Sequence, residues 1–233
     1  RDSRLHCMSI DIPMFLDGEF KQVKFFEPEG IALREEVDFF KLGRHKVYPY
    51  PHPETITLPR YLKGLKRVTN KGTVLPDEYY ELTMELCRLG LASKEPLLVR
   101  ECKISPYDFA IAYIIRERER ILKETNFGSQ KGCVMVVVSG KKEGKPKKYV
   151  FSMASESQAL GEGTGIPAAL GAVLVWQGKY KAEGVLPPEA GIDPVDFLDL
   201  VKKLLGMEKL GETDYPLVIE SIDESGRRER LSA

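Results

Sequence analysis

A group of residues able to hold a carboxylate lies at positions 67–70, within the stretch LKRVTNKGTVL. The guanidinium of Arg67 can donate two parallel hydrogen bonds to one carboxylate. Thr69 and Asn70 follow closely and can complete that contact, but both residue types also form turns. The residues therefore predict a carboxylate-binding segment made of Arg67, Thr69 and Asn70, with an exposed arginine beside an ordinary turn as the alternative.

A second candidate lies in GEGTGIPAALGAVLVW, where glycines at 161, 163 and 165 precede an apolar stretch. A dinucleotide fingerprint needs a strand that runs directly into G-x-G-x-x-G and a helix, followed by a second strand. Here the nearest strand pattern, KKYVFSM, ends about eight residues earlier, and KAEGVLPPEAG after the helix is not a strand. The chain also contains no Gly-Lys-Ser/Thr, which excludes a Walker loop. We therefore do not interpret this segment as a nucleotide site.

We expect instead that the glycine segment opens a helix, with Thr164 or a neighbour as its cap and Pro167 in its first turn. The glycines and alanines of the segment would allow close packing. A hydroxyl beside free backbone N–H groups also binds anions, including a substrate carboxylate. Thr164 is therefore a further substrate-binding candidate, with a plain helix cap as the alternative.

No catalytic acid, base or metal ligand is assigned from the sequence. His52 lies in the proline-rich PYPHPE, flanked by Tyr48 and Arg60, but no neighbour in the sequence is identified as its orienting partner. The histidines at 6, 45 and 52 and the cysteines at 7, 87, 102 and 133 are not spaced as metal ligands. The cysteines are expected as buried free thiols in a reducing cytosol.

The overall composition narrows the class of protein. The 35 lysines and arginines balance the 35 aspartates and glutamates, so charge gives no argument for nucleic acid or an anionic membrane as a partner. No apolar run approaches the roughly 18 residues of a spanning helix, and the start lacks the apolar core of a signal peptide. We expect a cytoplasmic protein that binds neither nucleic acid nor a membrane.

Local patterns predict the elements that would position these residues. A hairpin is expected over 10–26 around Asp17-Gly18, followed by strands in EEVDFF and RHKVYPYPH and a short helix or turn in PETITLPRYLKG. Helices are expected after Pro76, which Gly90 would end, and after Ser105-Pro106 and Asp193-Pro194. The RERER run in the second of these helices should form a solvated, self-paired surface.

The order of these elements indicates an α+β fold, with a mixed, mainly antiparallel sheet and helices packed on one face. CVMVVV is nearly continuous in apolar residues and is therefore expected as a central strand covered on both faces. KKEGKPKK would be its exposed connection, YPLVIESID a closing strand, and 225–233 a polar tail.

The stretch TGIPAALGAVLVWQGKYKAEGVLPPEAGIDPVDFLDLVKKLLG resembles the end of the saccharopine dehydrogenase family. The resemblance rests on Thr164-Gly165-x-Pro167, an alanine-rich helix, Gly184-Val185-Leu186-Pro187-Pro188-Glu189 and an Asp-Pro helix start. FLDGEFKQVKFFEPEG, VYPYPHPETITLPRYLKG and LKRVTNKGTVL are more loosely similar. An arginine before a glycine often contacts the substrate carboxylate in this family; here Arg67 is displaced from Gly72, which leaves the exact substrate open.

The resemblance implies that residues 1–233 are a single C-terminal substrate-binding and dimerisation domain of a longer chain, without its N-terminal Rossmann domain. It implies an oxidoreductase acting on the CH–NH group of an amino acid or a polyamine-like amine, and a homodimer. NAD or NADP would be bound mainly by the missing domain, so this chain alone should be inactive. The alternative is a non-catalytic module for amino-acid binding, protein interaction or dimerisation.

Overall fold

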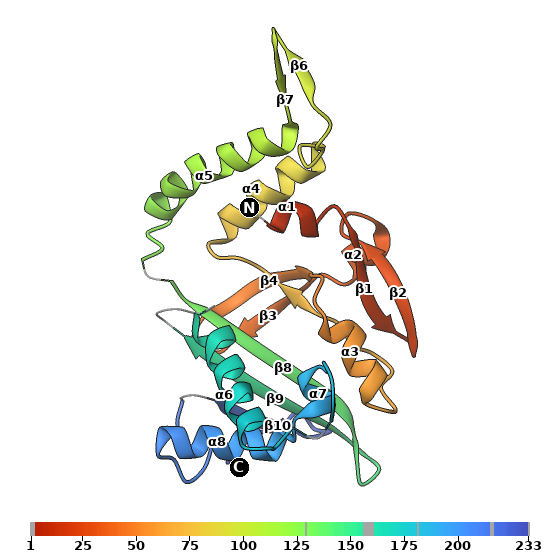
Figure 1. The fold of residues 1–233 in the computed structure, drawn as a ribbon, viewed down its shortest axis with the longest axis vertical. Coiled ribbons are helices and arrows are strands. Elements are labelled where there is room, and N and C mark those ends of the chain that lie inside the picture. Colours follow the sequence, from red (N-terminus) through yellow and green to blue (C-terminus); the bar gives the residue numbers. More distant parts are fainter. Residues whose placement is uncertain (1–2, 129, 156–160, 181, 215–216, 233) are drawn as a thin grey trace. The chain divides into compact units, whose positions relative to one another are not determined.

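The computed structural model describes residues 3–128, 130–155, 161–180, 182–214 and 217–232. They divide into two compact units. The first contains residues 1–37 and 45–128, and the second contains residues 38–44 and 129–233. Helices and strands are both abundant, and the expected α+β fold class is confirmed. The strands form four sheets rather than one, and each unit is described separately below (Figure 1).

The first unit begins with helix α1 (Ser3–Cys7) and a hairpin of β1 (Asp11–Leu16) and β2 (Glu19–Lys24). Asp17 and Gly18 join the strands with φ values of 58° and 83°, the left-handed pair that a two-residue hairpin turn requires. The antiparallel register places Ile12 opposite Val23, and both are buried. The predicted hairpin and its turn are confirmed.

A three-stranded sheet follows, in the order β3 (Glu35–Phe39), β4 (Gly43–Pro49) and β5 (Lys71–Gly72). Strand β4 ends at Pro49, as expected where a proline removes the N–H donor of a ladder. The short helix α2 (Pro28–Ala32) precedes β3, and α3 (Glu54–Tyr61) lies between β4 and β5.

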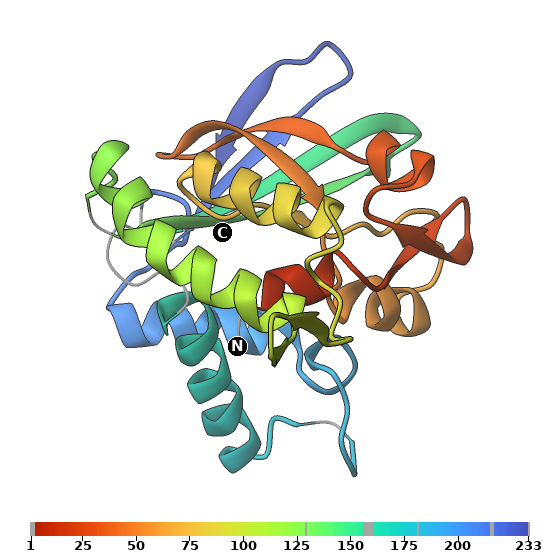
Figure 2. The ribbon, with the colours of Figure 1, turned by 90° about the horizontal axis from the view of Figure 1, so that it is seen from above.

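Two long helices complete most of the first unit, and Figure 2 shows them side by side. Helix α4 (Asp77–Arg88) is followed by Gly90 at φ 85°, and α5 (Pro106–Glu124) is capped by Ser105, whose Oγ accepts from the Asp108 N–H. Both predicted starts are confirmed. Ile114 and Ile121 of α5 are buried, whereas Ile115 is 62% exposed.

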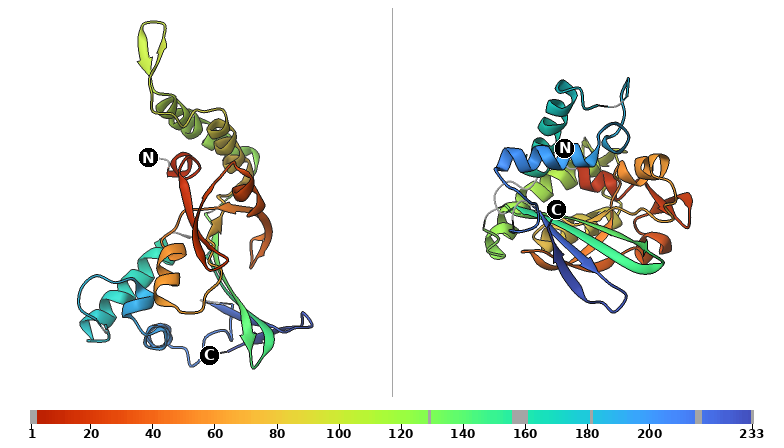
Figure 3. Two further views of the ribbon diagram at one scale, coloured as in Figure 1. Left: turned by 90° about the vertical axis from the view of Figure 1, so that its right-hand side faces the viewer. Right: turned by 90° about the horizontal axis from the view of Figure 1, so that it is seen from below.

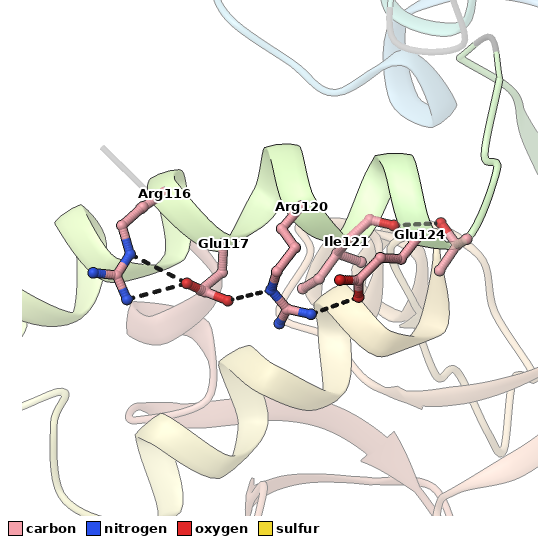
Figure 4. A network of polar contacts seen from close by, with 6 residues as sticks. Arg116, Glu117, Arg120, Ile121 and Glu124 are labelled. Atoms are coloured by element: carbon pink, nitrogen blue, oxygen red, sulfur yellow. Dashed lines mark hydrogen bonds and ion pairs between the residues drawn. The ribbon is translucent and has the colours of Figure 1, made fainter.

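The charged run of α5 forms an intrahelical ladder of ion pairs (Figure 4). Arg116 pairs with Glu117, which accepts from Arg120 Nε at 2.7 Å, and Arg120 also contacts Glu124. Hydrogen bonding from Arg120 is the largest cause that lowers the pKa of the Glu117 carboxyl. The predicted self-paired surface is confirmed.

A second hairpin in the first unit was not predicted. Strands β6 (Leu97–Val99) and β7 (Cys102–Ile104) pair antiparallel around Arg100, which has φ 56°. All six strand residues are exposed, including Cys102, so the expected burial of that thiol is wrong. Each strand has 3 residues, whereas strands are recognised in a sequence from runs of about 4 to 8 residues, which explains why this hairpin was not predicted.

The second unit is built on a four-stranded antiparallel sheet in the order β11-β10-β9-β8 (Figure 3). Its strands are β8 (Gly132–Lys142), β9 (Lys145–Ser155), β10 (Val218–Ile222) and β11 (Arg228–Leu231). Its helices are α6 (Ile166–Trp176), α7 (Pro188–Gly191) and α8 (Pro194–Leu205), and α6 packs with α8. Strand β11 lies within 225–233, where a polar tail was expected.

Two expectations about the long β8–β9 hairpin are wrong. Strand β8 is not central: it stands at the end of the sheet order, and its valines at 134, 136, 137 and 138 are about half exposed. A continuous apolar run identifies a strand with two apolar faces, but it does not say what covers them. The connection is also shorter than KKEGKPKK, since only Glu143 and Gly144 lie between the strands.

Among the described glycines of the first unit, Gly30 has the least room for a side chain. A Cβ at this position would lie 2.0 Å from the carbonyl oxygen of Lys24, a distance that forces the backbone to move. We expect Gly30→Ala to lower the free energy of unfolding by about 2–4 kcal/mol. Urea denaturation followed by circular dichroism measures this change.

Gly72→Ala is the matched control for that substitution, because a Cβ at Gly72 would meet no described atom within 4 Å. It should change the free energy of unfolding by less than about 1 kcal/mol. Equal losses for the two variants would contradict the steric argument.

Candidate functional site

The segment that carries Arg67 is fixed to the first hairpin by backbone hydrogen bonds. The N–H of Phe15 donates to the Val68 carbonyl at 3.0 Å, and the N–H of Val68 donates back to Phe15 at 2.8 Å. The N–H of Gly18 in the hairpin turn donates to the Lys66 carbonyl at 2.8 Å. The backbone on both sides of Arg67 is therefore held, while its side chain is exposed.

Thr69 and Asn70 lead directly into β5, which pairs with the end of β4. Tyr48 lies opposite Gly72 in this ladder, and the N–H of Tyr50 donates to the Asn70 carbonyl at 3.1 Å. The pairing brings the proline-rich segment alongside the 67–72 segment, although about 20 residues separate them in the sequence. Two stretches chosen separately from the sequence are thus neighbours in the fold.

Arg67 is available for a ligand. Within the described residues its guanidinium forms no hydrogen bond or ion pair, and the side chains of Thr69 and Asn70 are half-buried. The hydrogen bond from Lys21 lowers the pKa of Asp17, and the positive charge of Arg67 contributes a smaller effect in the same direction. An exposed guanidinium at this edge of the first unit can pair with an anion.

His52 has an orienting partner that was not identified from the sequence. Its Nδ1 contacts a carboxylate oxygen of Glu54, two residues further along the chain. Both side chains are about half exposed. The spacing of two residues in the sequence could have indicated this contact, because a turn at a helix start brings positions i and i+2 together.

A group of aromatic and charged side chains lies beside this segment, since Tyr48 pairs with Gly72. Tyr48 of β4 stacks between Phe25 and Tyr80, with ring centroids 5.8 and 4.9 Å away. The Arg34 guanidinium lies 5.1 Å from the Phe25 ring centroid and 5.4 Å from that of Tyr48. His45 of β4 approaches Asp77 at the start of α4, with Nδ1 3.2 Å from a carboxylate oxygen.

Burial governs the acidity of the two stacked tyrosines. Tyr48 is 7% exposed and Tyr80 is 2% exposed. Desolvation of the charged form raises the pKa of Tyr48, and the Glu81 and Asp77 carboxylates raise it further, against the opposing charge of Arg34. Burial likewise raises the pKa of Tyr80, far enough that this hydroxyl keeps its proton throughout the ordinary pH range.

Thr164 belongs to the second unit, and its predicted role as a helix cap is wrong. Gly161–Gly165 form a π-helical turn, η1, that continues directly into α6. The residue before α6 is Gly165, which has helical backbone angles and no side-chain cap hydrogen bond. Because the helical backbone already extends past Thr164, this residue does not stand at the helix start, and its side chain is exposed.

The glycines of this turn also have roles different from those expected. A Cβ at Gly165 would meet no described atom within 4 Å, and one at Gly163 would only touch the Met153 side chain at 4.0 Å. Close packing therefore does not explain Gly165. Because Gly161–Gly165 are helical, they also do not form an open phosphate-binding loop, so these residues do not fit a dinucleotide.

The GVLPPE segment is held by a single tyrosine. The Tyr180 hydroxyl donates to the Gly184 carbonyl and accepts from the Leu186 N–H, at 3.2 and 3.1 Å. A Cβ at Gly191 would lie 2.2 Å from the Tyr180 ring, so glycine is required there. Tyr180 thus fixes the backbone at Gly184 and Leu186.

Two features of the described part of the chain concern metal binding and membrane insertion. Within those ranges, no group of three or more histidine, cysteine, aspartate or glutamate side chains is arranged to hold a metal ion. No helix there is both long enough and apolar enough to span a bilayer.

Comparison with known proteins gives a consistent result along most of the chain. The family model described as the saccharopine dehydrogenase C-terminal domain matches residues 13–207. A carboxyaminopropylagmatine dehydrogenase from Synechocystis sp. is 26% identical over 209 residues, which cover 86% of this chain and 48% of that protein. A carboxynorspermidine synthase from Vibrio alginolyticus is 25% identical over 198 residues, covering 81% of this chain and 45% of that protein.

A solved structure shares the fold. The apo saccharopine dehydrogenase (L-Glu forming) from Saccharomyces cerevisiae superposes with a TM-score of 0.53 at 13% sequence identity, covering 94% of this chain and 61% of that one. The chain spans about half the length of the curated relatives it matches.

The raised pKa of Tyr80 predicts that the protein loses stability as the pH rises into the alkaline range. A tyrosine in the unfolded chain loses its proton near pH 10, whereas Tyr80 in the fold keeps it. Its contribution is therefore complete below about pH 10 and declines above that, by about 1.4 kcal/mol per pH unit. Tyr80→Phe should make this decline shallower.

Urea denaturation at a series of pH values from about 8 to 11.5 measures how steeply the free energy of unfolding falls above about pH 10. Tyr61→Phe, at an exposed tyrosine, is the control and should leave the wild-type decline unchanged. An unaltered slope in Tyr80→Phe would show that this hydroxyl is not the protected group.

Proposed function

Because the chain belongs to the saccharopine dehydrogenase C-terminal domain family, we propose that it is the substrate-binding domain of an NAD(P)-dependent oxidoreductase that acts on a CH–NH group. The substrate class is an amino acid or a polyamine-like amine. The match of the family model over residues 13–207 is the observation that carries this proposal. The relatives' names, a dehydrogenase of carboxyaminopropylagmatine and a synthase of carboxynorspermidine, support the choice of substrate class.

The proposed division of work assigns the nicotinamide cofactor to a Rossmann domain outside these residues. Two observations support it: the relatives are about twice as long as the matched region, and the 161–165 glycines are helical. The cofactor would supply the hydride chemistry when bound. The residues of this chain would bind and orient the amine substrate, which is the part of the reaction that depends on position.

We assign the substrate carboxylate to Arg67, with Thr69 and Asn70 as further contacts. The support is an exposed guanidinium without an ion pair in the described residues, on a backbone fixed at Lys66 and Val68. In the second unit, Thr164 is proposed separately as a substrate contact through its exposed hydroxyl alone, because it does not cap α6. No catalytic acid or base is assigned.

A homodimer is part of the proposal, and β8 is the surface that favours it. The strand has 11 residues, stands at the end of the sheet order and exposes valines on both of its faces. An exposed, long apolar edge is a template for pairing with another chain. A second copy of β8 can pair with this edge across a two-fold axis, because antiparallel pairing of identical strands is self-complementary.

The substrate assignment is tested in the longest natural form of the protein that includes its nucleotide-binding region. Reduction of NAD and NADP is followed at the nicotinamide absorbance with a panel of amino acids and carboxylated polyamines. Arg67→Ala should raise the substrate KM by about 10–100-fold with a smaller change in kcat, since a bidentate, charge-assisted contact is lost. Cofactor affinity should be unchanged.

Arg118→Ala on α5 is the matched control, at an arginine outside the proposed site, and should leave KM at the wild-type value. Cofactor binding without turnover on any substrate of the panel would favour a non-catalytic amino-acid-binding or interaction module. Wild-type KM in Arg67→Ala, alongside active enzyme, would overturn the carboxylate assignment but not the reaction class.

The dimer is tested on this chain directly. Val136→Lys should weaken dimerisation at least about tenfold, because a charge on the paired face must be desolvated when two copies associate. Light scattering coupled to gel filtration, across a dilution series, gives the monomer–dimer equilibrium. Val185→Lys changes a fully exposed valine outside β8 and should leave the monomer–dimer equilibrium unchanged. Equal behaviour of the two variants would remove β8 from the interface.

A further inference from the structure

The β6–β7 hairpin lies between the end of α4 and the start of α5, and it extends beyond both helices in Figure 1 and in the left view of Figure 3. Its two strands form a sheet of their own. A two-stranded hairpin is marginally stable at best in water unless another layer packs on it. Within the described part of the first unit nothing supplies that layer, since all six strand residues are exposed.

One face of this hairpin is wholly apolar. Directly opposed residues of a sheet point to the same side, and successive residues of a strand point to opposite sides. By the register of the two strands, one face consists of Leu97, Val99, Cys102 and Ile104, and the other of Leu98 and Lys103. Leu97, Val99 and Ile104 are 59%, 49% and 38% exposed. We call the side that carries these three residues and Cys102 the hairpin face.

The turn at the tip of the hairpin carries one charge of each sign, on Arg100 and Glu101. Both side chains are exposed, and neither forms an ion pair with a residue that the structure describes. If two copies meet around a two-fold axis with their tips side by side, Arg100 of each copy can pair with the partner's Glu101, because such a contact forms twice. The tip is therefore complementary in charge to itself.

Packing through faces fits these residues better than pairing through strand edges. Edge pairing would lengthen the sheet but leave the hairpin face in water. Along β7 it would also bring Lys103 close to the partner's Lys103, and like charges on opposed strands are destabilising. Face-to-face packing covers the apolar side chains of both copies and leaves Lys103 in water on the outer side.

We propose that the hairpin face packs against the hairpin face of a second copy of this chain, with the two tips side by side. Removal of the aliphatic side chains from water drives the association, and the Arg100–Glu101 pairs at its rim set the orientation. The contact is independent of the proposed reaction. It is also separate from β8, which belongs to the second unit.

The first test compares lysine substitutions at two adjacent positions. Val99→Lys places an ammonium on the hairpin face, where association would desolvate it, and should weaken self-association at least about tenfold. Leu98→Lys is the matched control on the opposite face, at a side chain that is 72% exposed, and should leave the association unchanged. Sedimentation equilibrium over a dilution series measures both dissociation constants.

Both variants are made in the Val136→Lys background, so that pairing through β8 does not contribute. A Val136→Lys protein that stays monomeric at every concentration would overturn the proposal, as would equal dissociation constants for the two added substitutions. If Val136→Lys itself changes nothing, the β8 interface is wrong, but the comparison of Val99→Lys with Leu98→Lys still decides the hairpin contact.

A charge swap tests whether the second partner is this same chain. Arg100→Glu should weaken association about 2–10-fold, because two ion pairs become repulsions. Adding Glu101→Arg should restore it, since both copies then carry the swapped charges. No restoration would overturn the side-by-side arrangement of the tips.

Cys102 gives an independent measure of how close the two faces lie. It is exposed on the hairpin face, so a short bis-maleimide should join two copies through it. Lys103→Cys in the Cys102→Ser background places an exposed thiol on the opposite face and controls for random collision. The natural thiol should be cross-linked at least about tenfold faster, because the partner's thiol is held nearby. Equal rates would contradict face-to-face packing.

Discussion

The first unit depends on the stack of Phe25, Tyr48 and Tyr80. These three rings come from the end of the first hairpin, from β4 and from α4, so one set of contacts joins three elements that are distant in sequence. Each aromatic pair contributes about 0.5–1.5 kcal/mol beyond its buried area. The Arg34 guanidinium lies near two of the rings and donates to the Phe25 carbonyl, which fixes the backbone that supplies the first ring.

The same stack connects the segments that carry several charged side chains of the first unit. Tyr48 begins the pairing with β5, so the position of its ring is coupled to the ladder that carries Asn70 and, beyond it, Arg67. On the other side, Tyr80 is on α4 next to Glu81 and one turn from Asp77. The exposed Arg67 and the Tyr48–Tyr80 stack thus belong to one connected body.

The sequence predicted what short-range chemistry determines. The Asp17-Gly18 turn, the Ser105 cap and the Arg116–Glu124 ladder each depend on residues no more than about eight positions apart, and all three are confirmed. The Tyr48–Tyr80 stack and the β4–β5 pairing could not be read in this way, because they join residues more than 20 positions apart. Thr164 illustrates the opposite error: a good cap residue has no such role when the helical backbone begins earlier.

The second unit poses a different physical problem, which is uncovered apolar surface. Helix α6 contains no charged residue, and its Trp176 is 82% exposed, while Leu170 and Leu174 on another face are buried. A helix that is apolar on every face is normally enclosed by protein. Strand β8 has the same character in a sheet, with exposed valines on both faces. Surfaces of this kind are stable in water when another protein surface covers them. These two uncovered apolar surfaces, those of α6 and β8, therefore belong to the second unit, whereas the stacked rings and Arg67 belong to the first.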